Sequence, residues 1–254
     1  MKKNAKIAVA VGVLAVITLI IVLSSTIFAV GSARIIWYNT PTSSLASLTN
    51  SAVLSSSGVE RKSVFMLDKD FAKRNLEKKY PRLRVVDLEV VFPNSLNIHV
   101  IERQDVYAVA LPNGTYAITD EYLRVLDVVS TYSSTNVNPV VLKIKDLEGS
   151  FKKGDDISSE YPHVFIDLYN AFVALGQSVT NFRALATNIE YTNAKLTIST
   201  HFGVTIILDN PTQNSESKMR MAIKTFELLS TEDYGKGTIE VFVNSQNKIE
   251  SRYY

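Results

Sequence analysis

The chain has 254 residues, of which 46% are hydrophobic and 20% are charged, and it contains no cysteine. This length allows one or two domains with a substantial core, and the missing cysteine excludes disulfides, thiolate catalysis and a lipoprotein anchor. If the three lysines among the first six residues are set aside, 24 basic and 25 acidic residues remain, so the rest of the chain is nearly neutral. Nucleic acid is therefore not an expected partner, because binding it requires a basic surface that neutralises phosphates.

An apolar segment opens the chain, and residues 7–33 carry no charge. A helix needs about 20 apolar residues to cross a membrane, so we predict a single transmembrane helix over residues 7–33. The three preceding lysines favour a cytoplasmic tail over residues 1–6, with the rest of the chain outside the cytoplasm. A cleaved signal peptide is the alternative, since Ala29, Gly31 and Ala33 suit a cleavage site. The long apolar run favours an uncleaved anchor, because a signal core spans only about 7–15 residues.

A small α/β domain is predicted over residues 34–104. Asp68 is a good N-cap for a helix from Lys69 to about Lys79, which Pro81 ends. Two strands with alternating apolar residues follow, on either side of Pro93. With a strand over 34–38 and an irregular helix within 41–57, the order predicts two helices against one face of a three-stranded sheet.

A larger α+β domain is predicted over residues 105–254, built on a long curved mixed sheet. Its clearest signal is a hairpin turn at Asn113-Gly114, where both residues tolerate positive φ. Helical spacing returns near Phe165 and near Met219, and each stripe indicates one core-facing helix. The last predicted strand runs from Lys248 to Tyr254.

The residues that could carry chemistry favour structural roles. His99 and His201 fall on polar strand faces and His163 starts a helix, and none has metal-ligand spacing. The carboxylate pairs occupy cap or turn positions, where they accept backbone N–H groups. These pairs are Asp68 with Asp70, Asp120 with Glu121, and Asp155 with Asp156. We therefore predict no catalytic, metal or cofactor residue, and no enzyme activity.

An ordered string of motifs runs through the first domain and into the second. It comprises Ser57-Gly58, Ser63 to Asp68, Leu76 with Tyr80-Pro81, Phe92-Pro93 with the strand ending at Glu102-Arg103, and the hairpin leading to Asp120. This string resembles the FtsQ/DivIB family of bacterial cell-division proteins, in which a POTRA domain precedes a β domain. At a strand end leading into a new domain, Glu102 and Arg103 are expected to fix the interdomain angle, with direct partner contact as the alternative.

The resemblance implies a non-enzymatic membrane scaffold at the division septum. Its implied partners are FtsL-like and FtsB/DivIC-like bitopic division proteins, and through them the septal peptidoglycan synthase complex. A POTRA-bearing envelope assembly or export factor unrelated to division is the main alternative. A membrane-anchored hydrolase is a further one, and it would require a polar cleft that these residues do not supply.

The closing strand is the predicted partner-binding site. As a sheet edge it would offer unpaired N–H and C=O groups to a partner strand, and the resemblance implies a similar use of this region. We expect charge selectivity from Lys248, Glu250 and Arg252. The predicted site comprises Lys248, Ile249, Glu250, Ser251, Arg252, Tyr253 and Tyr254, with apolar contact from Ile249, Tyr253 and Tyr254. Alternatively, the charges only protect the edge from aggregation.

Overall fold

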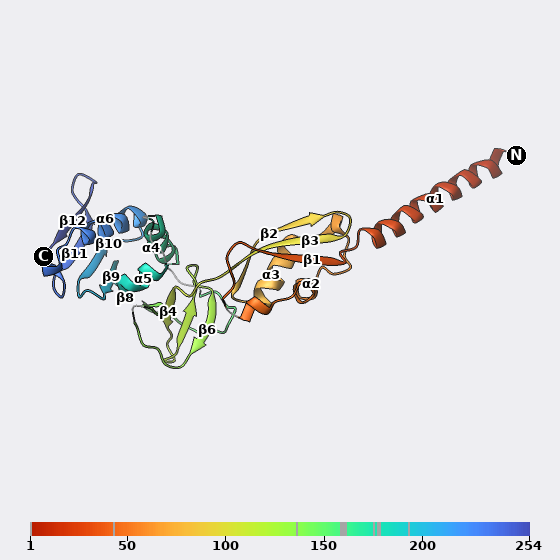
Figure 1. The fold of residues 1–254 in the computed structure, drawn as a ribbon. Coiled ribbons are helices and arrows are strands. Elements are labelled where there is room, and N and C mark those ends of the chain that lie inside the picture. Colours follow the sequence, from red (N-terminus) through yellow and green to blue (C-terminus); the bar gives the residue numbers. More distant parts are fainter. Residues whose placement is uncertain are drawn as a thin grey trace. The chain divides into compact units, whose positions relative to one another are not determined.

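The computed structural model describes residues 2–42, 44–135, 137–157, 162–174, 176, 179–192 and 194–254. The chain divides into two compact units, Met1–Arg103 and Gln104–Tyr254 (Figure 1). Both units combine helices with a β-sheet, so the predicted α+β class is observed, with a small sheet in the first unit and a large mixed sheet in the second.

The first unit begins with a long helix and continues as a small α/β fold. Its elements are α1 (Lys2–Ile27), β1 (Ser32–Trp37), η1 (Ser44–Ser47), α2 (Asn50–Ser57), η2 (Val64–Met66), α3 (Lys69–Lys79), β2 (Leu83–Val91) and β3 (Ser95–Glu102). The sheet order is β1-β3-β2, with β1 parallel and β2 antiparallel to β3. Helices α2 and α3 lie on one face of this sheet (Figure 1), as predicted.

The prediction of a transmembrane helix over residues 7–33 is wrong. Within the part of the chain that the structure describes, no helix has both the length and the apolar character that a membrane crossing requires. One physical reason lies at the end of the predicted span: α1 stops at Ile27, and the apolar residues beyond it belong to the folded unit. Val30 is fully buried and its N–H donates to Lys62 O, while Ala33 lies in β1 opposite Leu96. The single apolar run in the sequence is thus divided between the helix α1 and the start of the small sheet.

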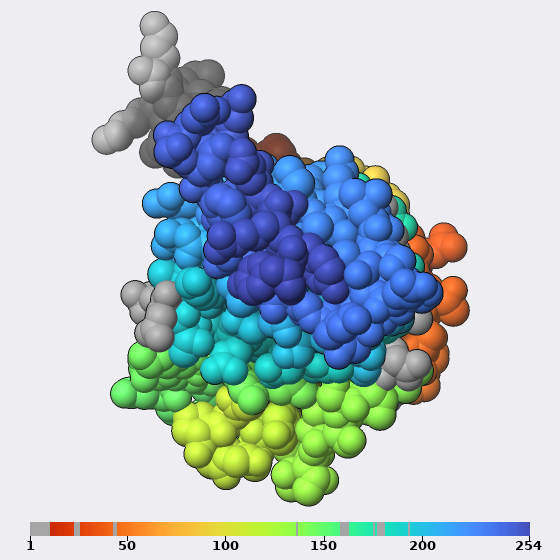
Figure 2. Space-filling model, turned by 90° about the vertical axis from the view of Figure 1, so that its left-hand side faces the viewer, coloured from red at the N-terminus to blue at the C-terminus, as the bar shows by residue number. Residues whose placement is uncertain are grey.

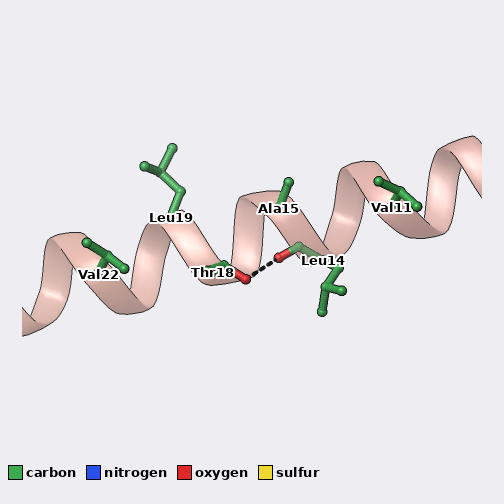
Figure 3. Close-up of a pocket in the computed structure, with 6 residues that line it drawn as sticks. All are labelled: Val11, Leu14, Ala15, Thr18, Leu19 and Val22. Atoms are coloured by element: carbon green, nitrogen blue, oxygen red, sulfur yellow. Dashed lines mark hydrogen bonds between the residues drawn. The ribbon is translucent and has the colours of Figure 1, made fainter.

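Between Val11 and Val22, where the structure describes the side chains of α1, the large aliphatic ones are exposed. Figure 3 shows a shallow groove on this stretch, lined by Val11, Leu14, Ala15, Thr18, Leu19 and Val22. The Thr18 hydroxyl donates to Leu14 O at 2.8 Å, so its polar group is satisfied within the helix. Met1 and the side chains of Lys2, Lys3 and Lys6, on which the predicted tail and orientation depend, lie outside the described residues.

Local signals define the other helices of the first unit. Asp68 caps α3, because its carboxylate accepts the Phe71 N–H at 2.8 Å, and the helix covers the predicted residues Lys69–Lys79. Thr49 caps α2 in the same way by accepting from Ala52 N. These helices pack Val53, Ala72, Leu76 and other apolar residues against the sheet residues Leu96, Ile98 and Val100.

The second unit is built on a nine-stranded sheet in the order β12-β11-β10-β9-β8-β7-β4-β5-β6. Its elements are β4 (Tyr107–Ala110), β5 (Tyr116–Thr119), β6 (Val125–Val129), β7 (Val140–Ile144), α4 (Pro162–Ala174), α5 (Val179–Leu185), β8 (Ala186–Thr192), β9 (Lys195–Thr200), β10 (Thr205–Asp209), α6 (Ser215–Glu227), η3 (Thr231–Asp233), β11 (Thr238–Val243) and β12 (Ile249–Tyr253). The pairs β4–β7, β7–β8 and β10–β11 are parallel and the others are antiparallel, so the sheet is mixed.

Helices α4, α5 and α6 pack against this sheet and enclose the core. Tyr107 is fully buried, and its hydroxyl donates to Phe165 O at 2.8 Å, which ties β4 to α4. Burial raises the pKa of this tyrosine well above its usual value. The predicted hairpin at Asn113-Gly114 joins β4 to β5, and Gly114 adopts a φ of 82°.

Candidate functional site

One carboxylate of each acidic pair accepts backbone hydrogen bonds. Asp120 accepts the N–H groups of Tyr122 and Arg124 at 2.9 and 2.8 Å, and Asp155 accepts from Lys152 N at 2.8 Å. The predicted cap and turn roles of Asp68, Asp120 and Asp155 are therefore confirmed. Among the residues that the structure describes, no group of three or more His, Asp or Glu side chains is placed to hold a metal ion.

The three histidines belong to three different segments: His99 lies in β3, His163 in α4 and His201 in the turn after β9. His163 and His201 are exposed. Only 18% of the His99 side chain is exposed, since its ring stacks on Tyr38 with centroids 5.5 Å apart, and its Nε2 lies 3.6 Å from a Glu89 carboxylate oxygen. The sequence pattern places His99 on the outer face of the sheet, but it does not indicate that a ring covers it.

Glu102 ends β3 and takes part in a network that closes the first unit. Its carboxylate accepts the Thr42 N–H at 2.5 Å. Asn39 holds the Glu102 backbone from both sides: its Oδ1 accepts the Glu102 N–H at 2.8 Å, and its Nδ2 donates to the carbonyl at 3.0 Å. The contribution of Asn39 and Thr42 was not predicted, because they lie about 60 residues away in the sequence and within no recognisable motif.

Arg103 forms an ion pair with Glu77 of α3 at 3.1 Å, and both side chains are largely buried, 8% and 15% exposed. The other carboxylate oxygen of Glu77 accepts the Val85 N–H at 2.9 Å, beside the β-bulge between Val85 and Asp87. These contacts of Glu102 and Arg103 lie within the first unit. The interdomain role expected for Glu102 and Arg103 stays a prediction.

The seven predicted partner-binding residues lie at one edge of the large sheet, because β12 pairs with β11 and ends the strand order. Figure 2 shows the C-terminal residues, in the darkest blue, lying across the surface of this end of the second unit. The strand spans Ile249–Tyr253, slightly shorter than predicted. Asn244 organises the preceding turn: its Oδ1 accepts the N–H groups of Gln246 and Lys248 at 2.9 and 3.0 Å.

The hydrogen-bond pattern of β12 determines which backbone groups face outward. Thr238 and Tyr254 exchange two hydrogen bonds, of 2.7 and 3.1 Å. Bonded and non-bonded pairs alternate along an antiparallel ladder, so residues 252 and 250 also bond to β11. The N–H and C=O groups of Ile249, Ser251 and Tyr253 therefore point away from β11. No described strand of the chain pairs with this outer side.

The side chains of β12 divide between two faces. Ile249 and Tyr253 are half-buried against the unit's own core, so part of the apolar contact expected for a partner is used internally. The Tyr253 hydroxyl donates toward Asp233 O and Lys236 O at 3.1 and 3.2 Å. Tyr254, in contrast, is 63% exposed.

The face of β12 that does not pack on the core carries a charged cluster, which the sequence pattern did not reveal. The Arg252 guanidinium pairs with Glu240 of β11, directly opposite in the ladder, and Lys195 Nζ lies 3.4 Å from the same carboxylate. The hydrogen bond from Arg252 lowers the pKa of Glu240. The guanidinium also lies 5.3 and 5.6 Å from the ring centroids of Phe242 and Tyr254. Since Arg252 belongs to β12, this cluster lies beside the open edge of the sheet.

Comparison with known proteins identifies part of the first unit. Residues 43–103 match the family model of the POTRA domain, FtsQ-type. No curated protein matches the chain. The match covers the segment from η1 to the end of β3, including the Glu102-Arg103 pair, and the large sheet that follows is consistent with the β domain of the FtsQ/DivIB family. The resemblance seen in the sequence is thus confirmed: the chain carries a POTRA domain of the FtsQ/DivIB family.

Proposed function

We propose that this protein is a non-enzymatic scaffold of bacterial cell division, and that it binds a partner by accepting a strand on the outer side of β12. The observation that carries the proposal is the open edge of β12, where the backbone groups of Ile249, Ser251 and Tyr253 point outward. A strand added there would satisfy these groups through main-chain hydrogen bonds.

The FtsQ-type POTRA domain supports a role in division. On this basis we propose FtsL-like and FtsB/DivIC-like proteins as partners, and the septal peptidoglycan synthase complex as the assembly that they regulate. The division septum is the proposed location. A fluorescent fusion tests it: a ring at midcell supports the division role, and uniform labelling of the cell outline supports the envelope assembly or export alternative.

The strand-addition mechanism is tested by Ser251→Pro. The Ser251 N–H faces outward, so proline removes a bond that only a partner would make and leaves the ladder to β11 intact. Ser251→Ala is the matched control, because it also loses the side-chain hydroxyl but keeps the N–H. Deleting residues 248–254 would be less informative, since it would also remove Ile249 and Tyr253 from the core.

The measurement is affinity for the isolated FtsB/DivIC-like and FtsL-like domains from the same cell. We expect Ser251→Pro to weaken binding of one of them about ten-fold or more, since an unsatisfied backbone group costs about 1–3 kcal/mol. Ser251→Ala should stay within two-fold of the unmodified protein. Equal affinities of the proline and alanine variants would contradict strand addition at this edge.

A further inference from the structure

A second feature of the second unit is a pocket among its helices. A pocket of about 220 Å³ opens between α4, α5 and α6. Its most buried lining residues are Phe172, Leu185, Ile223 and Phe226. These side chains form an apolar floor that remains accessible through the pocket mouth.

One wall of the pocket is held rigidly in place. Phe202 lines the pocket, and its ring packs on Phe226 and Tyr234 with centroid distances of 5.5 and 4.9 Å. The loop that carries Phe202 is fixed because Gly235 N donates to Phe202 O at 2.6 Å. Gly203 (φ 73°) lies so close to Gly235 that an added Cβ would be 2.7 Å from its Cα. A preformed wall lowers the cost of binding, since less is ordered when the occupant enters.

The size of the pocket suits one bulky side chain. An apolar cavity of about 150 Å³ is enough to bind benzene, whereas pockets for drug-sized ligands and cofactors start at about 300 Å³. Phe202 is 39% exposed, and Leu228, which follows α6, is 86% exposed. The volume is therefore sufficient for a single apolar anchor from a partner protein and lies below the usual range for drug-sized ligands and cofactors.

The rim of the pocket favours a positive charge. Glu227 lines the pocket and is the last residue of α6, so its carboxylate adds to the partial negative charge at the helix C-terminus. Asn181 of α5 is the other polar lining residue described, and no basic residue is among the described residues that line the pocket. The exposed Lys224 lies in the same last turn of α6 but does not line the pocket.

We propose that this pocket is a second docking point for a partner protein, and that it receives a bulky apolar side chain with an adjacent Lys or Arg. The apolar chain enters between α4, α5 and α6, and the cation lies at Glu227 and the C-terminus of α6. The proposal does not depend on strand addition at β12, because none of the pocket residues belongs to that strand.

Capped tetrapeptides probe this chemistry directly. Gly-Phe-Lys-Gly carries both features, Gly-Phe-Glu-Gly reverses the charge, and Gly-Ala-Lys-Gly removes the anchor. Saturation-transfer NMR titrations on the full chain would measure binding. We expect the Phe-Lys peptide to bind about five-fold more tightly than the Phe-Glu peptide, which corresponds to about 1 kcal/mol for an exposed charge contact. The Ala-Lys peptide should show no saturable binding.

Two variants, each with a matched control, assign the binding to this pocket. Glu227→Gln should remove the preference for Lys over Glu, whereas Glu148→Gln, at an exposed acid in the loop after β7, should retain it. Ala184→Phe should fill the pocket and abolish binding, and Ala184→Ser should not. Because Glu227 is exposed, its substitution tests the proposal even if Ala184→Phe fails to fold. Absent binding, equal binding of the Lys and Glu peptides, or a preference unaffected by Glu227→Gln would overturn the proposal.

Discussion

Thr225 on α6 and Ser251 on β12 share a hydrogen bond of 2.7 Å between their side-chain oxygens. The Thr225 hydroxyl also donates to Met221 O at 2.9 Å. A hydroxyl has only one hydrogen, so Ser251 is the donor in the shared bond. The edge strand is thus fixed to the helix that packs against it, while its outward backbone groups stay open.

Thr225→Val should loosen this attachment without changing the edge itself. Valine has nearly the same shape but leaves the Ser251 hydroxyl without this acceptor, so we expect the second unit to lose about 1 kcal/mol of unfolding free energy. Urea unfolding followed by a probe in that unit would measure the loss. Partner affinity should remain within two-fold. Unchanged stability would show that the bond contributes nothing to holding β12.

Glu77 should contribute to the stability of the first unit, because its carboxylate accepts hydrogen bonds from both Arg103 and Val85 N. Glu77→Ala removes both acceptors, and we expect a loss of about 3 kcal/mol, as for breaking a buried ion pair. Glu77→Gln keeps an oxygen for Val85 N but also breaks the ion pair with Arg103, so it should cost about 1 kcal/mol less than alanine, the value of the one retained hydrogen bond. Equal losses for the two variants, measured by denaturant unfolding, would contradict this account.

Gly203 and Gly176 offer a matched pair of substitutions, since both adopt positive φ, of 73° and 76°. An added Cβ at Gly176 meets no atom within 4 Å, whereas at Gly203 it would overlap the Gly235 backbone. Gly176→Ala should therefore cost only about 1 kcal/mol for the left-handed backbone. Gly203→Ala should cost clearly more, and it should also weaken binding of the Phe-Lys peptide. Similar melting temperatures for the two variants would show that Gly203 is not tightly packed against Gly235.

The pair formed by Glu240 and Arg252 should make stability depend on acid pH. The pKa of Glu240 is lowered in the folded protein from its ordinary value of 4.5, so the folded state binds fewer protons there than the unfolded state. Its contribution is present above pH 4.5 and is lost as the pH falls through the lowered pKa. Because the Arg252 side chain is 61% exposed and solvent screens its charge, the effect should be about 1 kcal/mol or less.

The comparison with Glu240→Gln isolates this effect. Melting temperatures of the two proteins should differ at pH 7, with the unmodified protein more stable, and should converge toward pH 3. A difference that persists unchanged at pH 3 would show that Glu240 contributes through packing rather than through its charge.

The sequence was most informative where one local signal decides the structure. Asp68 as a cap, Pro81 as a helix end and Asn113-Gly114 as a turn each act within a few residues, and all three were predicted correctly. The edge position of the last strand could also be anticipated. The predicted membrane span failed because hydropathy does not distinguish the apolar helix from the core residues Val30 and Ala33 that follow it.

The remaining parts of the candidate sites depend on long-range contacts. Asn39 meets Glu102 across 63 residues, and Lys195 meets Glu240 across 45. The pocket combines Phe172, Phe202 and Phe226 from three separate segments, and each reads in the sequence as an ordinary core residue. Such arrangements follow from the strand order, which no short motif encodes.

Hydrogen exchange of the β12 amides, with and without the bound partner, tests the central claim most directly. In the free protein the amides of Glu250 and Arg252, which bond to β11, should be protected, while those of Ile249, Ser251 and Tyr253 exchange quickly. On binding, these three outward amides should become protected together. If they exchange as quickly in the complex as in the free protein, the partner does not add a strand to this edge.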